Sequence, residues 1–348
     1  MRRLYSLTAP FVSRLTRSDG ILSKDILQPA ETEEVTPPFI SDASREKISG
    51  CHHWSSIPNE LAQLDAREVT HAPVIRYTHG SGIVGPDGFA TGKKRLRLEP
   101  TFIRNALTKP VTQTSEVTYI NEMATHLYFG HWLKEGVSQT YLTEGDRYYL
   151  SNPATWAHCA QYRTALGLRA RDEHYVIADH VITYSDFSQG SLKRERYEKM
   201  RAQLAAAFPM TEETHEKVFM WRGNEGESRN FHKADEVRDK LEADGWKTLD
   251  VTLPLADLYK TLSGAKIVAS MEGSHLNHIY FCTQPDTTQV ILVPHDRFNT
   301  MPLGLARAVG NSIGICVLAG DQGNGYQMDF DAFAEAIDQT FATSQKTT

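Results

Sequence analysis

The sequence of 348 residues is poor in cysteine, with only four, at positions 51, 159, 282 and 316, and no C-x-x-C pair among them. A disulfide-stabilised scaffold needs a higher cysteine density, and a structural zinc site needs paired ligands. We therefore expect four reduced thiols in a cytosolic protein. The triplet Cys51-His52-His53 has the side chains of a metal site. Without a second ligand pair, it is better interpreted as a polar turn.

Long apolar runs and an excess of positive charge are also missing. The longest apolar stretches, such as residues 313–319, are far shorter than the roughly 18 residues of a membrane-spanning helix. Lysine and arginine number 37 against 43 acidic residues, and the resulting net charge of −6 gives no overall attraction to nucleic acid. We therefore expect neither a membrane span nor a nucleic-acid partner.

The first 18 residues differ from the rest, because they combine four arginines and interleaved apolar side chains with no acidic residue. Three interpretations stay open: a transit peptide, a basic amphipathic helix on an anionic membrane surface, and a poorly ordered tail. No apolar segment ends in a small-residue cleavage site, so a secretory signal is not indicated. The expected location is the cytoplasm, with peripheral membrane contact through this segment under the second interpretation.

The chain is long enough for two domains of roughly 150 residues each. Residues 1–48 contain the basic segment, then an acidic stretch and Pro37-Pro38, as in a linker. We predict an N-terminal domain at 49–190 and a C-terminal domain at 191–345. A charged helix predicted at 192–208 marks the seam.

Strand-like and helix-like segments alternate after residue 117, which predicts parallel sheets covered by helices on both faces. In the C-terminal half, strands are predicted at 217–221, 247–251, 266–270, 289–294 and 314–318, and helices at 233–244, 255–263, 274–281 and 331–341. In the N-terminal half, helices are predicted at 121–141 and 154–166, and strands at 147–150 and 180–184. The fold class is therefore α/β, with two Rossmann-like domains facing a cleft.

A glycine-rich stretch at 72–98 predicts β-hairpins. It includes Gly80-Ser81-Gly82-Ile83-Val84-Gly85, which has the G-x-G-x-x-G spacing of dinucleotide-binding proteins. That motif needs a helix directly after the glycines, whereas Pro86-Asp87-Gly88 follows here. We interpret these glycines as hairpin turns.

The strongest functional signal lies in residues 266–281, where a buried strand is followed by a small-residue loop and a helix. Gly273 allows a ligand to approach the backbone, and Ser274 is predicted to cap the helix, leaving free N–H groups in its first turn. The other polar residues of this turn are Glu272, His275, Asn277 and His278. Ligands bind outside the carboxyl ends of parallel strands, so we predict a diphosphate-binding site here. A capped structural helix is the alternative.

Two arginines follow another predicted strand. Arg222 comes directly after residues 217–221, and Arg229 precedes the next helix. Guanidinium groups bind phosphate oxygens through two hydrogen bonds and stay charged. We predict that both arginines reach the diphosphate site, and surface ion pairs are the alternative.

A histidine in the N-terminal half is a candidate base. His131 lies beside Trp132 on a predicted apolar helix, and Glu135 follows one turn later on the same face. An imidazole accepts a proton near neutral pH, and the carboxylate would orient it. A structural histidine is the alternative.

The stretch from about residue 117 to 295 resembles glycosyltransferase family 61, which includes plant xylosyltransferases and bacterial capsular polysaccharide proteins. That family has a strand ending in Ser-Arg, a loop with a second Arg, a helix, and then His-Gly-Ala-Gly-Leu-Thr-Asn/His. Trp221-Arg222, Arg229 and residues 272–278 follow this order here, and His131-Trp132-Leu133 with Glu135 matches the family's His-Trp-Leu and acid. Glu272 replaces the leading His, His275 replaces the second Gly, and Lys233-Ala234 replaces a common Asn-Glu pair.

The resemblance implies a two-domain GT-B glycosyltransferase, a hexosyl- or pentosyltransferase of surface or capsular polysaccharide biosynthesis. A nucleotide-sugar donor would bind the C-terminal domain and a glycan acceptor the N-terminal one. His131 would deprotonate the acceptor hydroxyl in an inverting transfer, while Arg222, Arg229 and the helix N-terminus stabilise the leaving diphosphate. Because such groups can replace a divalent ion, we expect no metal and no other cofactor. Glu272 either accepts hydrogen bonds from ribose or sugar hydroxyls or acts as the base.

Two other functions stay open. A non-catalytic nucleotide-binding or glycan-binding protein on the same fold would explain the altered motif positions. A nicotinamide-dependent oxidoreductase is the second, and it requires NAD binding.

Overall fold

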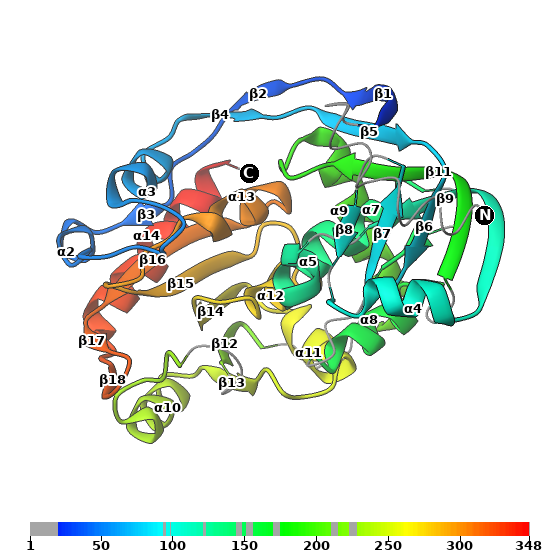
Figure 1. Cartoon of the computed structure of the whole chain (residues 1–348). Helices are drawn as coiled ribbons and strands as arrows, with labels where there is room; N and C mark the ends of the chain where they lie inside the picture. The colour runs from blue at the N-terminus through cyan, green and yellow to red at the C-terminus, as the bar shows by residue number, and fades with distance from the viewer. Residues whose placement is uncertain are drawn as a thin grey trace. The chain divides into compact units, whose positions relative to one another are not determined.

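The computed structural model describes residues 20–92, 95–97, 99–120, 123–143, 148–150, 156–169, 175–209, 215–222 and 228–347 (Figure 1). The chain divides into two compact units. The first contains the chain up to Glu31 together with Thr70–Arg196, and the second contains Thr32–Val69 and Tyr197–Thr348. Each unit is described by itself below.

The second unit is built on a six-stranded parallel sheet. Its strand order is β13-β12-β14-β15-β16-β3. The strands are β3 (Phe39–Ile40), β12 (Lys217–Trp221), β13 (Lys247–Asp250), β14 (Ile267–Met271), β15 (Thr288–Pro294) and β16 (Ser312–Leu318). Every neighbouring pair runs in parallel, in a register such as Phe219 opposite Ala269 and Ala269 opposite Val290.

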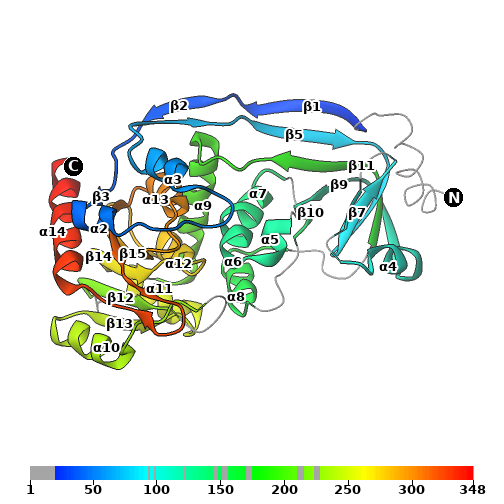
Figure 2. The same ribbon diagram turned by 60° about the vertical axis from the view of Figure 1, so that its left-hand side comes forward.

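Helices cover both faces of this sheet (Figure 2). One face packs its alternate apolar residues against α10 (Ala234–Ala243) and α14 (Phe330–Thr347) in a core that includes Phe219, Trp246 and Phe333. The other three helices are α11 (Leu255–Leu262), α12 (Leu276–Cys282) and α13 (Met301–Ala308). They lie on the opposite face, as right-handed strand–helix–strand crossovers require for this strand order.

The sequence pattern predicted this part of the fold well. All five strands and four helices predicted after residue 216 are present, with ends shifted by a few residues, and α14 runs further than predicted. The near-continuous apolar strands are typical of a parallel sheet that is buried on both faces. The α/β class is confirmed.

The first unit contains a mixed, eight-stranded sheet. Its strands are β1 (Ile21–Gln28), β5 (Val74–His79), β6 (Gly82–Gly85), β7 (Gly88–Thr91), β8 (Arg95–Arg97), β9 (Val111–Tyr119), β10 (Tyr148–Tyr149) and β11 (Tyr175–Ser185). Among the described strands of this sheet, only β9 with β10 and β9 with β11 pair in parallel. The helices are α4 (Phe102–Thr108), α5 (Met123–Leu127), α6 (Phe129–His131), α7 (Ser138–Thr140), α8 (His158–Ala165) and α9 (Ser191–Ala207), with a π-helix, η1 (Trp132–Val137), between α6 and α7.

This sheet corrects the prediction of a second Rossmann-like domain. Strands β1, β5, β11, β6, β7 and β8 pair antiparallel in that order, and short hairpins connect β6 to β7 and β7 to β8. The hairpin prediction is confirmed, since β6 turns back into β7 with Gly85 opposite Gly88 and no helix follows the G-x-G-x-x-G stretch.

The predicted domain boundaries differ from the two units. Residues 49–69 were expected in the N-terminal domain, but residues 32–69 belong to the second unit. Strand β3 extends the parallel sheet beside β16, and the N–H groups of Ser49 and Gly50 donate to His295 O at 2.9 and 3.0 Å. The same segment includes α2 (Asp42–Glu46) and α3 (Ile57–Leu64), and the two boundaries with the first unit fall within β2 (Glu31–Glu34) and β4 (Glu68–His71). The seam falls within α9, near the predicted position.

The basic segment at 1–18 lies outside the described residues, so its three interpretations stay predictions. Among the helices described, none combines the length and the apolar character needed to cross a bilayer. All four cysteines lie in the described residues, and none of them is in a disulfide.

Candidate functional site

The second unit has a ligand-binding position defined by its topology. Numbered by first appearance, the five strands β12 to β16 have the order 2-1-3-4-5, so successive connections change direction between β12 and β14. Open α/β sheets bind ligands at such a switch point, outside the carboxyl ends of the strands. Arg222 directly follows β12, and Glu272 and Gly273 directly follow β14. These residues of the predicted diphosphate site therefore lie at the switch point.

Both predicted arginines contact the turn after β14. Arg222 Nη1 donates to Glu272 O at 3.0 Å, and Arg229 Nη1 donates to the same oxygen at 2.7 Å. Arg229 also forms an ion pair with the Glu272 carboxylate at 2.6 Å, with only 7% of its side chain exposed. We call Arg222, Arg229, Glu272 and Gly273 the switch-point cluster. The surface ion pairs that were the alternative for Arg229 do not apply, because its guanidinium is buried against the turn.

His275 is held beneath the cluster as a neutral imidazole. Its Nε2 lies 2.8 Å from Ser270 Oγ, and that hydroxyl donates its proton to Met220 O at 2.7 Å. Nε2 must therefore carry a proton and donate to Ser270. Burial, together with the charges of Arg222 and Arg229, lowers the pKa of His275 well below its usual value. Ser270 was not predicted, and a small polar residue inside an apolar strand is the only sequence signal for it.

The start of α12 differs from the prediction. The N-cap residue is His275 rather than Ser274, and its side chain makes no capping hydrogen bond. The N–H groups of residues 276, 277 and 278 donate to the carbonyls of residues 273, 274 and 275 at 3.0–3.2 Å. These N–H groups are therefore not free to bind a diphosphate, in contrast to the prediction for this helix N-terminus.

The last two predicted contact residues lie in the interior. Asn277 is 6% exposed and donates from Nδ2 to Ser274 O at 2.8 Å, so it fixes the turn. His278 is 1% exposed. Ser274 is half-buried and lies at the surface of the turn. Of these three residues, Ser274 is the one placed to meet a ligand.

The first unit contains the predicted base. His131 Nδ1 lies 2.7 Å from Glu135 Oε2, and 26% of the imidazole is exposed against 6% of the carboxyl. Burial opposes ionisation of Glu135. The hydrogen bond from His131 and the charge of Lys134 outweigh burial and lower the pKa of this carboxyl. An ionised Glu135 accepts a hydrogen bond from the Nδ1–H of His131, which leaves the lone pair of Nε2 available to accept a proton.

The backbone around this pair was predicted as one helix at 121–141, but α5, α6, η1 and α7 divide it. His131 ends α6, and Glu135 lies in the π-helix η1. Phe129 and Trp132 anchor the segment with nearly parallel rings 6.2 Å apart, both almost fully buried. π-Helical turns occur frequently at functional sites, and nothing in the local sequence distinguishes one from an α-helix.

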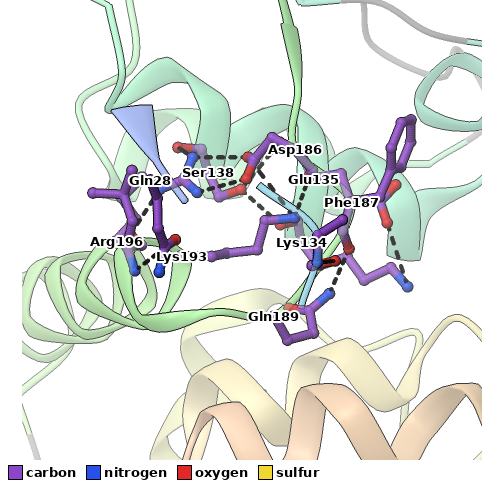
Figure 3. Close-up of polar contacts among 12 residues, drawn as sticks. Gln28, Lys134, Glu135, Ser138, Asp186, Phe187, Gln189, Lys193 and Arg196 are labelled. Atoms are coloured by element: carbon purple, nitrogen blue, oxygen red, sulfur yellow. Dashed lines mark hydrogen bonds and ion pairs between the residues drawn. The ribbon is translucent and has the colours of Figure 1, made fainter. Parts of the chain in front are cut away.

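The charged side chains of Asp186 and of helix α9 lie around Glu135 (Figure 3). Asp186, just after β11, binds Arg196 of α9 through two hydrogen bonds of 2.8 and 2.9 Å. Lys193, which is fully buried, donates to Asp186 O at 2.5 Å. Burial lowers the pKa of Lys193 to about 8, and Asp186 and Glu135 oppose this shift. We call Lys134, Glu135, Asp186, Lys193 and Arg196 the buried charge network.

This network was not predicted, because Lys193 and Arg196 belong to a segment whose sequence is typical of a solvent-exposed charged helix. In the structure they are 0% and 2% exposed. Pairing with Asp186 makes their burial possible, because an isolated charge is strongly disfavoured in a protein interior.

The described part of the chain contains no group of three or more His, Cys, Asp or Glu side chains arranged to hold a metal ion. The sequence contains one Asp-x-Asp, the spacing of two carboxylates that can hold a divalent ion, at Asp329-Phe330-Asp331. Asp329 there binds Lys47 at 2.8 Å and caps the N–H of Ala332 at 3.1 Å, which gives it a structural role at the start of α14.

Comparison with family models gives a match to Glycosyltransferase 61 over residues 129–291. Residues 129–291 belong to glycosyltransferase family 61. The glycosyltransferase 61 region contains every predicted site residue from His131 to His278, and the family indicates that the chain is a glycosyltransferase.

Other comparisons add little. No curated protein matches the chain. Similar solved structures include a flavodoxin-like domain from Synechococcus sp., with 11% identity, covering 38% of this chain and 98% of that one, at a TM-score of 0.26. A diflavin flavoprotein A3 from Nostoc sp. has 12% identity and covers 37% of this chain and 92% of that one, at a TM-score of 0.25. Similarity at this level supports no conclusion about fold or function.

Proposed function

We propose that this glycosyltransferase moves a sugar from a nucleotide-sugar to a hydroxyl of a glycan acceptor, with inversion at the anomeric carbon. The observation that carries the proposal is the switch-point cluster. Two guanidinium groups, Arg222 and Arg229, meet at the carboxyl ends of β12 and β14 inside the glycosyltransferase 61 region. A diphosphate is a ligand of matching charge for this position.

In this proposal the cluster stabilises the leaving group. As the bond from the anomeric carbon to the diphosphate oxygen breaks, negative charge grows on that oxygen. Arg222 and Arg229 are already held in place by Glu272 O, so little reorganisation is needed when the charge develops. The neutral His275 beneath them adds no charge and keeps the turn in position through Ser270.

His131 is the proposed base. Its Nε2 accepts the proton of the acceptor hydroxyl while the hydroxyl oxygen attacks the anomeric carbon. The ionised Glu135 keeps the proton of the neutral imidazole on Nδ1 and stabilises the imidazolium that forms. The proposal requires Nε2 to reach the acceptor hydroxyl in the working enzyme.

Glu272 is assigned a positioning role rather than that of the base. Its carboxylate is 13% exposed and forms an ion pair with Arg229, so it already has a partner in the turn. We assign it to orienting Arg229 and to accepting hydrogen bonds from donor hydroxyls. The GT-B arrangement, with the donor on the second unit, and a role in surface or capsular polysaccharide biosynthesis belong to the same proposal.

The function is tested by incubating the full chain with individual nucleotide-sugars and oligosaccharide acceptors. Mass spectrometry would detect the glycosylated product, and NMR would assign its anomeric configuration. Tight nucleotide-sugar binding without turnover for any acceptor would instead favour the non-catalytic binding protein.

A further inference from the structure

Three consecutive aromatic rings lie together on the second unit, outside the glycosyltransferase 61 region. The ring centroids of His52 and His53 are 4.2 Å apart, and those of His53 and Trp54 are 4.5 Å apart. His52 and Trp54 are nearly parallel, at an interplanar angle of 19°. Trp54 is 79% exposed, the largest exposure among the exposed large apolar side chains of the described chain. We call these three residues the ring cluster.

The backbone before the ring cluster is fixed to the end of β15. Ser49 and Gly50 donate their N–H groups to His295 O, and Phe298 donates its N–H to Gly50 O at 3.0 Å. A side chain on Gly50 would collide with the Asp296 carbonyl, so glycine permits this close approach. The ring cluster therefore begins two residues after a rigid anchor at the carboxyl edge of the parallel sheet.

This anchor lies near the switch-point cluster along the same edge. β15 is the parallel neighbour of β14, and the N–H of Glu272 donates to Leu292 O at 2.8 Å. His295 follows Leu292 by three residues, which corresponds to about 10 Å of extended chain. A nucleoside attached to a diphosphate spans a similar length. A ligand with its phosphates at Arg222 and Arg229, and its nucleoside directed along this edge toward β15, would bring its base toward the ring cluster.

We propose that Trp54, supported by His52 and His53, is a stacking platform for the nucleobase of the donor, an inference that rests on the proposed function. An exposed indole offers a flat π-face, and every base has a matching one. The adjacent imidazoles supply hydrogen-bonding nitrogens for the edge of the base. Cys51, His52 and His53 form no three-ligand metal group in the described residues.

The test compares two kinds of ligand on the full chain by calorimetry. Inorganic pyrophosphate probes the switch-point cluster alone, whereas UDP, GDP, CDP and ADP probe the cluster and the platform together. Trp54→Ala should weaken the best nucleoside diphosphate about 5- to 150-fold, as expected for the loss of one base-stacking contact, and leave pyrophosphate affinity within about 2-fold. Trp54→Phe, which keeps a ring, should retain most of the affinity.

Leu253→Ala is the matched control, because Leu253 is another exposed apolar side chain of the second unit. It should bind both ligands as the wild type does. Equal nucleotide affinity of wild type and Trp54→Ala overturns the platform while leaving the proposed function intact. If the wild type binds neither pyrophosphate nor any nucleotide, the proposed function itself is wrong.

Discussion

The Arg222 guanidinium occupies the space that a side chain on residue 273 would need. A Cβ built on Gly273 would overlap Arg222 Nη1 and come within 2.9 Å of His275 Nδ1. Glycine is therefore required at this position for Arg222 to reach Glu272 O. The relationship ties the glycine of the turn to an arginine that is 51 positions earlier in the sequence.

Gly273→Ala should consequently weaken nucleotide-sugar binding. The flexible arginine can move aside, so the fold survives, but the lost charge-assisted hydrogen bond should raise the donor Kd about 10- to 150-fold. Calorimetry would measure this change. Gly80→Ala is the control, because a Cβ there meets nothing closer than Leu22 Cδ1 at 3.9 Å. Unchanged donor affinity in Gly273→Ala would remove Arg222 from the donor site.

His131→Ala should lower kcat by about 10²- to 10⁴-fold with little change in the donor KM, since a base acts in the transition state. The matched control is His126→Ala. His126 also pairs with a carboxylate, Glu99 at 3.1 Å, but is assigned no role in transfer. Steady-state product formation compares the two variants. A similar loss in both would indicate structural damage rather than loss of the base.

Removal of divalent ions should leave the rate within about 2-fold, because Arg222 and Arg229 supply the positive charge at the diphosphate in our proposal. The assay is product formation after dialysis against EDTA, with Mg²⁺ and Mn²⁺ added back separately. Abolished activity that one of these ions restores would contradict metal independence.

Lys193→Met should change how stability depends on pH. Burial lowers the folded-state pKa of Lys193 to about 8 from a model-compound value of 10.5. Between these values the unfolded chain binds the extra proton, so the contribution of Lys193 to unfolding free energy rises with pH through this window. The difference between wild type and variant in urea unfolding should therefore change from pH 7.5 to pH 10.5. Lys199→Met, on the exposed face of α9, should show no such change.

Arg196→Ala should destabilise the protein by about 3–5 kcal/mol, because it leaves Asp186 buried without its guanidinium partner. Arg45→Ala breaks a comparable ion pair with Asp65 that is largely exposed, and should cost less than about 1 kcal/mol. Equilibrium denaturation would measure both. Equal costs would mean that the network is solvated in solution.

How much of the molecule the sequence predicts depends on how local the signal is. The parallel sheet of the second unit follows from apolar strands and capped or glycine-terminated helices that are contiguous in sequence, such as α10 ending before Gly245. The turn after β14 and the pairing of His131 with Glu135 are also local, and both are present. Their catalytic roles stay predictions.

The missed features depend on residues far apart in the chain. Strand β3 joins the sheet beside β16 across more than 270 residues, and its two-residue length gives no periodic signal. Lys193 looks like a surface residue until Asp186 and Glu135 are placed beside it. The π-helix η1 contains residue types that also form α-helices, so its local sequence does not distinguish it from one. Its side chains Trp132 and Leu133 are fully buried.

The short β3 ladder has a practical consequence for expression. β16 would be the last strand of its sheet without residues 39–40, and its unpaired backbone could then recruit another chain. A truncated version starting after residue 48 would uncover this strand while keeping the entire glycosyltransferase 61 region. Such a fragment should aggregate at concentrations where the full chain stays monodisperse.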